Sequence, residues 1–294
     1  MAFFDINNFV IDRIVRGVAL SQKDDSVLFS INQIQNASLN CASESTDAVD
    51  AMGTPIATFY RAKSAEFSAE NALFDMNLMA TQLGTKKKVA KDNEKILVPA
   101  MESFTVGVTN ADQTSTYTKT EAGAVTVTYV MKHAPKIDPT EIYMLNGDST
   151  FGAKFTKAKT TTAQNGEFTV TADNLGKSII TITDNTSRNE ECIADGAEMF
   201  VMYEYETTNA VEVVNSAKDF PVGCKFVMEV LGCDVCDQTN LVYAYVIFNN
   251  AKLSPDFDWS IATDGTHPFS MKAQQDYCDK EKRLFSIVIP GDQE

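Results

Sequence analysis

The sequence predicts a mainly β protein, a sandwich or barrel with one flanking helix. About ten segments alternate apolar and polar residues with the period of two that strands show when one face packs on a core. Only one segment has helical spacing instead. No fixed-period repeat or low-complexity tract is visible, and 294 residues are enough for one large β domain or two ordinary ones.

The N-terminal part predicts an arm, a strand and a loop. Residues 1–25 mix apolar and charged side chains in a stretch too short for its own core, so this N-terminal arm is expected to dock on the body or on a neighbouring subunit. The remainder, 26–294, is expected to be the main β domain, with 26–41 as its first strand. Residues 42–54 are small, polar and acidic, which predicts an exposed loop.

One helix is predicted after residue 68. Ser68 is the expected N-cap, and Gly84 is the expected C-terminal stop. The helical spacing is carried by Ala69, Ala72, Leu73, Met76, Ala80 and Leu83. Its apolar side chains predict packing against a sheet.

The middle of the chain predicts further strands. Residues 104–109 and 125–131 alternate, and a polar turn region, 110–122, separates them, so they are expected to form a hairpin with one wet, threonine-rich face. Residues 197–207 are apolar on both faces, which predicts a strand buried between two layers.

The segment 146–190 differs in composition. It starts at a strong turn signal, Asn146-Gly147, and is rich in Thr, Lys, Asn and Gly. Two short strands, 167–172 and 178–183, are predicted within it. We interpret the segment as a β-rich insertion that projects from the main domain, because too few strands are visible for a separate immunoglobulin-like domain.

Charge and composition exclude several classes. The chain has 25 Lys plus Arg against 40 Asp plus Glu, a formal charge of -15, and a pI near 4.6. Such a surface repels a phosphate backbone instead of gripping it. The N-terminus lacks a signal-peptide pattern, and no apolar run approaches the ~20 residues that span a bilayer, so we expect folding in the cytosol and no membrane partner.

The sharpest candidate for a metal site is Cys233-x-x-Cys236. A structural zinc site needs four ligands and there is no second such motif, so Cys224 and Cys278 would have to complete it. The favoured interpretation is two cysteines in a turn between strands, with no metal and no cofactor.

No catalytic pattern stands out, so an enzyme is not expected. The two histidines, His133 and His267, adjoin turn residues and are expected in loops, outside any nucleophile motif. Phosphate-binding glycine loops are absent from the sequence. Trp259 with Asp256 and Asp258 leaves open a carbohydrate-binding β-sandwich, although a lone Trp more often packs its ring.

Two patches carry a resemblance to a known family. The first is the C-terminal stretch 225–289, where strands 225–232 and 241–248 precede Phe248-Asn-Asn-Ala-Lys-Leu-Ser254 and the segment from Phe269 to Ile289. The second runs from Ile56-Ala-Thr-Phe-Tyr-Arg-Ala-Lys63 through Phe67 to Gly84. Together these patches resemble tail tube (major tail) proteins of long-tailed bacteriophages.

The resemblance implies a structural role in the virion. It implies hexameric rings that stack into a hollow tube, with long hairpins completing an inner β-barrel between subunits, and double-stranded DNA passing through without specific binding. Partners would be copies of the chain and other tail proteins such as a sheath, baseplate or terminator, assembled in the host cytoplasm. The loop at 42–54, with Glu44, Asp47 and Asp50, would reach the next ring, and lumen-facing residues are not identified. A capsid decoration protein or another β-protein of the virion is the alternative.

Overall fold

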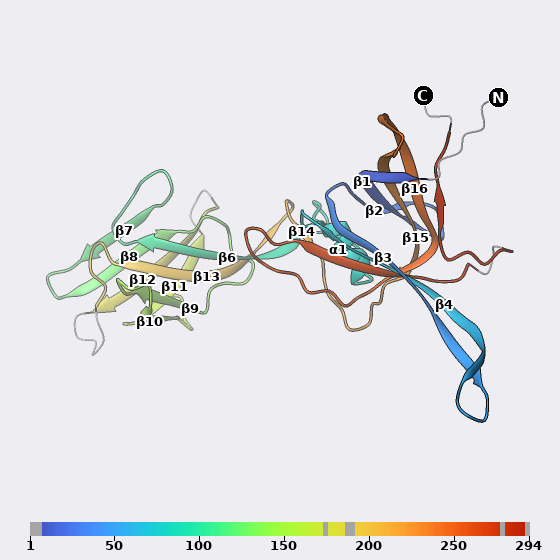
Figure 1. Ribbon diagram of the computed structural model, residues 1–294. Helices are drawn as coiled ribbons and strands as arrows, with labels where there is room; N and C mark the ends of the chain where they lie inside the picture. The colour runs from blue at the N-terminus through green and yellow to red at the C-terminus, as the bar shows by residue number, and fades with distance from the viewer. Residues whose placement is uncertain (1–7, 173–175, 186–191, 277–279, 292–294) are drawn as a thin grey trace. The chain divides into compact units, whose positions relative to one another are not determined.

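The chain folds into two compact units. The computed structural model describes residues 8–172, 176–185, 192–276 and 280–291, and these form eighteen strands and one helix (Figure 1). The mainly β class with one helix is therefore confirmed. Unit 1 comprises Met1–Lys88 with Glu212–Glu294, and unit 2 comprises Val89–Val211. Where the chain passes from one unit to the other, β5 (Lys88–Val89) and β14 (Val211–Glu212) form a two-stranded sheet.

Unit 1 is an eight-stranded sheet with one helix. The strand order is β2-β1-β15-β16-β17-β4-β3, and β18 pairs with β16 beside this path. All the strand pairs are antiparallel. The strands are β1 (Phe9–Ser21), β2 (Val27–Ile31), β3 (Ile34–Val49), β4 (Pro55–Asn71), β15 (Gly223–Asp234), β16 (Asp237–Leu253), β17 (His267–Ala273) and β18 (Ser286–Val288).

Phenylalanines form the core of unit 1. Phe226 on β15 is fully buried and lies with its ring centroid 5.8 Å from that of Phe67 on β4 and 6.4 Å from that of Phe269 on β17. These strands are not neighbours in the sheet order, so the sheet curls over to bring its two halves face to face. Gly17 on β1 leaves the room that the Phe226 ring occupies, because a Cβ at that position would lie 2.8 Å from the ring.

The helix starts later than the sequence predicts. Helix α1 is Met76–Gln82, and its N-cap is Asp75, whose carboxylate accepts hydrogen bonds from the backbone N–H groups of Asn77 and Leu78. The predicted cap, Ser68, and the residues up to Asn71 belong to β4, where pairing with β17 and β3 overrides the helical spacing. The predicted stop is confirmed, since Gly84 has a φ of +73° directly after the C-cap.

His267 is a buried part of unit 1, contrary to the loop position predicted for it. It is the first residue of β17 and is fully buried. Its Nδ1 accepts from the backbone N–H of Asp75 at 3.4 Å, so Nε2 carries the proton and donates to Gln82 Oε1 at 2.8 Å. Burial lowers the pKa of His267, although the Asp75 carboxylate opposes that shift. The neutral ring therefore joins β17 to both ends of α1.

Acid is expected to destabilise unit 1 through His267. Because its pKa is lowered in the folded chain, the histidine stabilises the fold fully above about pH 6.5, its unfolded value, and this contribution falls as the pH drops toward the folded pKa. Chemical denaturation at pH 7.5 and pH 5 measures the loss. The variant His267→Gln should show a smaller loss than the wild type, and His133→Gln, in unit 2, should behave as the wild type; equal losses in all three would contradict the assignment.

Unit 2 is a second eight-stranded sheet. Its order is β6-β13-β9-β10-β11-β12-β8-β7. Among the described strands of this unit, only β10 and β11 pair in parallel. The strands are β6 (Ile96–Thr105), β7 (Ser115–Lys119), β8 (Ala124–Val130), β9 (Glu141–Leu145), β10 (Phe151–Lys157), β11 (Glu167–Ala172), β12 (Ser178–Asn185) and β13 (Glu198–Thr207).

The two ends of this second sheet face each other. Phe104 on β6 stacks on Tyr129 on β8, with ring centroids 3.9 Å apart. Beside them the buried carboxylate of Glu102 accepts hydrogen bonds from the hydroxyls of Tyr129 at 2.7 Å and Tyr203 at 2.6 Å. Burial and the bond to Glu102 raise the pKa of both tyrosines. The sheet thus closes on an apolar core in which the buried Glu102 carboxylate is hydrogen-bonded at both oxygens.

Several predictions for the middle of the chain need correction. The hairpin predicted between 104–109 and 125–131 does not form, because β8 pairs with β7, which lies inside the predicted turn region. Strand β6 pairs instead with β13. Strand β13 is buried on one face only, with Met202 exposed, so it does not lie between two layers. The turn at Asn146 and the strands at 167–172 and 178–183 are present as predicted.

The structure shows where the segment 146–190 and the N-terminal arm lie. The segment 146–190 lies inside unit 2, which begins at Val89. Of the arm 1–25, residues 1–7 lie outside the described residues, and Phe9–Ser21 forms β1, paired with β15 and β2. Among the described residues, no helix is long and apolar enough to cross a membrane.

Candidate functional site: an assembly surface on the β3–β4 hairpin

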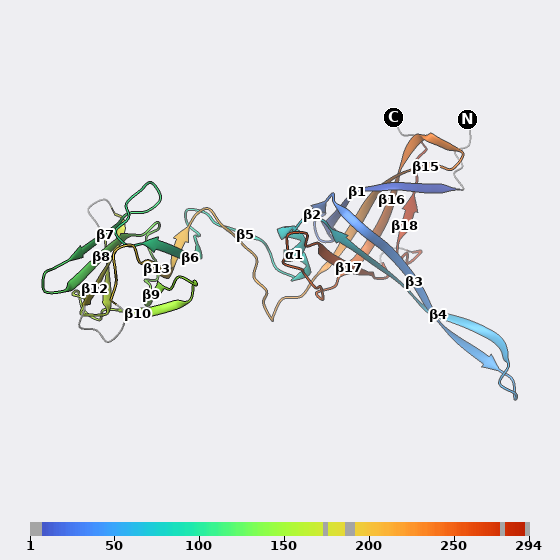
Figure 2. The same ribbon diagram turned by 60° about the vertical axis from the view of Figure 1, so that its left-hand side comes forward.

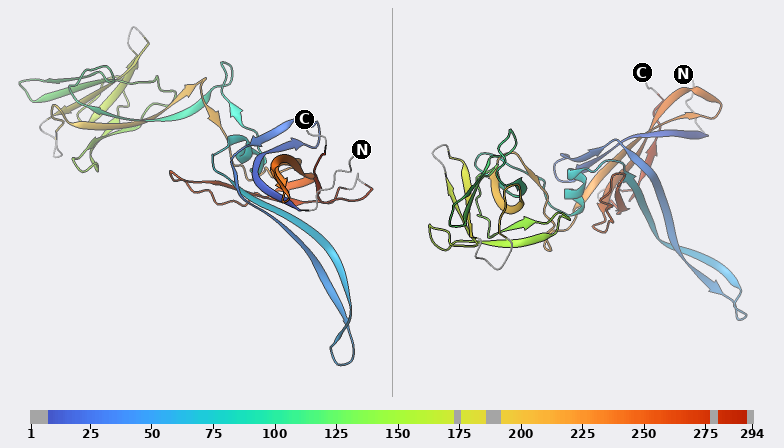
Figure 3. Two further views of the ribbon diagram at one scale, coloured as in Figure 1. Left: turned by 45° about the horizontal axis from the view of Figure 1, so that its top comes forward. Right: turned by 90° about the vertical axis from the view of Figure 1, so that its left-hand side faces the viewer.

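The β3–β4 hairpin extends beyond the core of unit 1. In Figures 1, 2 and 3 its outer part projects from the other strands of the unit. Every residue of β3 after Ile34 is exposed, as is every residue of β4 before Ala65. Strand β17 pairs with β4 only from Glu66 onward, so over the described residues the outer hairpin is a two-stranded ribbon with no third strand. Both of its edges therefore present unpaired backbone donors and acceptors.

Aromatic side chains cover both faces of this ribbon. Phe59 pairs with Thr46, and Tyr60 with Ser45, so the two neighbouring rings point to opposite faces. Phe59 is 54% and Tyr60 71% exposed. A two-stranded hairpin is marginal in water by itself, and exposed apolar area of this kind marks contact surfaces. The hairpin thus has the features of a segment that is completed by another chain.

Two of the three register shifts in the hairpin lie beside residues with a positive φ. The pairing register shifts beside Asn36 on β3 and beside Ala62 on β4, and these residues have φ values of +50° and +48°. Asparagine tolerates this left-handed conformation, but alanine adopts it at a cost. Bulges increase local twist and bend a strand. The bend in the hairpin is therefore encoded in the backbone, and Ala62 holds it at the expense of some strain.

Ala62→Gly is expected to make the outer hairpin more stable. Glycine adopts a positive φ freely, so the change should gain about 0.5–1 kcal/mol in the local opening free energy of the hairpin. Hydrogen exchange of hairpin amides measures it. The matched control is Ala57→Gly, which lies opposite Ala48 and has no positive φ, so glycine there should speed exchange. Faster exchange in Ala62→Gly as well would contradict the strain assigned to residue 62.

The three acidic candidates lie on this hairpin, but mostly outside a loop. Glu44 and Asp47 belong to β3, because 42–49 continues the strand predicted to end at residue 41, and only 50–54 is a turn. The Asp47 carboxylate accepts from the Thr58 hydroxyl at 2.6 Å across the ribbon. The Asp50 carboxylate accepts from the N–H groups of Met52 and Thr54 and so holds the turn. Two of the three acids therefore also stabilise the hairpin itself.

The cysteine motif lies at the tip of another hairpin, as predicted. Cys233 is half-buried near the end of β15 and Cys236 is exposed in the turn before β16. Cys224 cannot join them, because it lies nine residue steps before Cys233 on the same strand, about 30 Å at the usual rise. Burial raises the pKa of the Cys224 thiol to about 11. Cys278 lies outside the described residues, and among those described no three His, Cys, Asp or Glu side chains are grouped as metal ligands.

The possible sugar-binding residues do not form one surface. Trp259 is half-buried, and its ring stacks on Phe74, centroids 4.4 Å apart. Asp256 and Asp258 instead line a hollow of about 450 Å³ beside Glu70, and the Trp259 ring is not part of its lining. The lone tryptophan thus packs its ring against a neighbour, which is the more common role of a single Trp. His133, in a loop, stacks on Tyr205.

The sequence pointed to this hairpin without showing its exposure. Its aromatic strand, 56–63, belongs to one of the patches that resemble tail tube proteins, but the sequence analysis does not predict that Phe59 and Tyr60 are exposed. The signal available was the adjacent pair itself, because neighbours in a strand face opposite sides and cannot both face one core. The small, acidic composition of 42–49 predicts a loop, so the sequence does not show that these residues pair with the aromatic strand.

Fold and surface together define a mainly β protein with an open-edged hairpin that exposes aromatic side chains. Comparison with known families gives the particular group. The model of the YomU/Tube protein family matches residues 9–283, so the chain belongs to this family, a family of phage tail tube proteins. Such proteins are structural components of the virion that assemble with copies of themselves and with other tail proteins. A search of curated proteins found no match.

Proposed function

We propose that copies of this chain form closed rings, six to a ring, that stack into the tube through which double-stranded DNA leaves the phage. The observation that carries the proposal is the bare β3–β4 hairpin, with aromatic rings on both faces and both edges unpaired. Side-by-side hairpins from successive copies would pair these edges and form a continuous inner barrel. The function is assembly and conduction, without catalysis.

The topology of unit 1 supports ring closure. Strand β2 ends its sheet at one side and β3 at the other, so one copy offers two different edges. Contacts between unlike surfaces are heterologous, and they close into a ring when the rotation allows it. We further propose that Glu44 and the turn at Asp50 meet the next ring and that 146–190 projects outward. Strand β1 would stay paired with β15 and β2 of its own chain.

The net charge supports passage without binding. A formal charge of -15 repels a polyanion, so a wall made of such copies would let DNA slide without adhesion. Assembly in the host cytoplasm and attachment to a sheath, baseplate or terminator belong to the same proposal. Within the part of the chain that the structure describes, no contact favours the decoration or sugar-binding alternatives over this one.

Electron microscopy of the purified full chain, with its mass in solution, tests the proposal. We expect hollow rings or tubes with a central bore, and a mass in solution that is a multiple of the 32.3 kDa chain. A monomer or a compact trimer that persists at high concentration would overturn it. A decoration protein would then become the better interpretation.

A further inference from the structure

Four steps of the sequence join an Asn or Asp to a following Gly. They are Asn146-Gly147, Asn165-Gly166, Asp195-Gly196 and Asp264-Gly265. Asparagine is a thermolabile residue, and a following glycine lets the next backbone nitrogen approach the side-chain carbonyl carbon closely. That nitrogen reacts without its proton, so a hydrogen bond that the glycine N–H donates protects the step. The folded backbone therefore determines which of the four steps can react.

In three of the steps the glycine N–H already donates to a backbone carbonyl. The bonds run from Gly166 to Thr183 at 2.9 Å, from Gly196 to Val106 at 3.1 Å and from Gly265 to Ala262 at 3.0 Å. Each of these N–H groups must leave its acceptor before the nitrogen can lose its proton. Gly147 differs from them, because no acceptor for its N–H lies among the residues that the structure describes.

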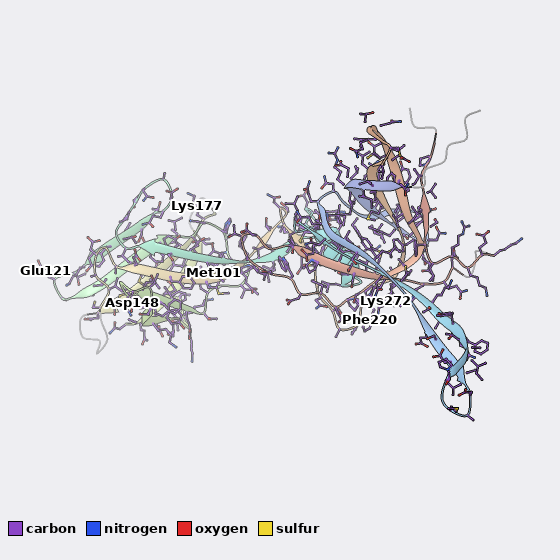
Figure 4. The ribbon with its side chains drawn as sticks, viewed as in Figure 1. Met101, Glu121, Asp148, Lys177, Phe220 and Lys272 are labelled. Carbon is purple, nitrogen blue, oxygen red and sulfur yellow. The ribbon has the colours of Figure 1, made fainter. Side chains whose placement is uncertain are left out.

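The turn between β9 and β10 holds this unprotected step in the solvent. Asn146 and Gly147 are both exposed, and they precede Asp148, which is labelled in Figure 4. The Asn146 N–H donates to the Thr150 carbonyl at 2.9 Å, and the Asn146 carbonyl accepts from the Ser149 N–H at 2.8 Å. Because both bonds leave the Gly147 nitrogen free, water and base reach it while the turn stays folded.

We propose that Asn146 is a site of spontaneous deamidation in the folded chain, and that the other three steps stay intact. The Gly147 nitrogen loses its proton and attacks Cγ of Asn146, and the side-chain nitrogen leaves as ammonia. Water then opens the resulting five-membered succinimide ring at either carbonyl. The product is aspartate or isoaspartate at position 146, with one water consumed and one ammonia released.

The product alters the β9–β10 turn. Isoaspartate carries the backbone through the side chain and so lengthens the turn by one atom. Either product loses the amide donor that Asn146 Nδ2 now directs to Thr150 Oγ1 at 2.9 Å, and it adds a negative charge near Asp148. Strand β10 depends on this turn, because its pairing with β11 is confined to Thr156 and Lys157. We therefore expect β10 to loosen while the rest of unit 2 keeps its pairing.

Peptide mapping of the intact chain tests the proposal. After incubation in mildly alkaline buffer, mass spectrometry should find the amide-to-acid mass difference in the peptide that contains Asn146. Isoaspartyl methyltransferase should label that peptide, and it should label no peptide at Asp195 or Asp264. Conversion should be at least about tenfold faster at Asn146 than at Asn165, whose glycine must first break a bond to β12. In urea-unfolded chain the two asparagines should convert at similar rates.

Two variants confirm the position and the attacking nitrogen. Gly147→Ala should slow conversion at least about tenfold, because a methyl group hinders the approach of the nitrogen. The turn should tolerate this change, since a Cβ at Gly147 meets no atom within 4 Å and its φ is not positive. The matched control, Asn165→Gln, should leave the conversion at Asn146 unchanged.

Two results would overturn the proposal. One is an equal rate at Asn146 and Asn165 in the folded chain. The other is no conversion at Asn146 under conditions that convert the unfolded chain. Circular dichroism of Gly147→Ala shows whether the variant is folded during the measurement. The outcome is independent of whether the chain forms rings, which electron microscopy decides separately.

Discussion

Replacing Phe59 and Tyr60 together by serine is expected to abolish rings and tubes while unit 1 stays folded. Both rings are exposed in the single chain and lie on opposite faces of the β3–β4 ribbon, so neither contributes to the core. Burying an aromatic side chain of this size at a contact is worth about 1.5–3 kcal/mol. Losing two should therefore weaken each contact between copies by at least about a hundredfold.

The readout is electron microscopy combined with sedimentation. The matched control is Phe220→Ser, since Phe220 is similarly exposed on unit 1 but lies outside the hairpin. That variant should polymerise like the wild type. All three proteins should have the same free energy of unfolding to within about 0.5 kcal/mol. Tubes of normal length from the double variant would show that the hairpin is not the assembly surface.

Phe226→Ala is expected to cost unit 1 about 3–5 kcal/mol of its free energy of unfolding. The ring is fully buried and contacts those of Phe29, Phe67, Phe248 and Phe269, with centroid distances between 5.8 and 6.4 Å. Gly17 lies against it as well. Truncation would leave a cavity between two halves of a curled sheet, which cannot collapse without breaking strand pairs.

Denaturant unfolding measures the loss of free energy of unfolding, and hydrogen exchange shows which unit it affects. Amides of β15 and β4 should exchange faster in Phe226→Ala, whereas those of β12 in unit 2 should not. The control variants are Phe168→Ala, which removes a fully buried ring from unit 2 and should show the reverse pattern, and Phe220→Ala, an exposed ring whose loss should be nearly neutral. A loss below about 1 kcal/mol in Phe226→Ala would contradict the role of this ring as the centre of the core.

The corrections to the sequence-based predictions have a shared cause. Residues 69–73 fit a helical pattern, and yet Ala69 and Asn71 are buried at the strand period because β17 and β3 lie on both sides of them. Residues 42–49 have poor strand propensity and are nonetheless strand, because β4 supplies hydrogen bonds along their length. In both cases a partner that is distant in sequence overrides the local preference.

The position of His267 illustrates the same limit for a candidate site residue. Its neighbour Pro268 predicts a turn, but the residue begins β17 and its ring is enclosed by α1. Nothing local distinguishes it from His133, which lies in a loop as predicted. The difference arises because Asp75 and Gln82, almost two hundred residues earlier, provide partners for both ring nitrogens.

The sequence by itself determined the β class, the single helix with its Gly84 stop, the turn at Asn146 and the family resemblance, because alternation, capping and turn chemistry act over a few residues. Only the tertiary structure decided where the chain divides into units, which strands pair, and which apolar side chains remain exposed. Phe59 and Phe67 belong to one strand, and the first is exposed while the second is core. That difference depends on whether another layer covers the strand, and a layer is supplied by residues distant in sequence.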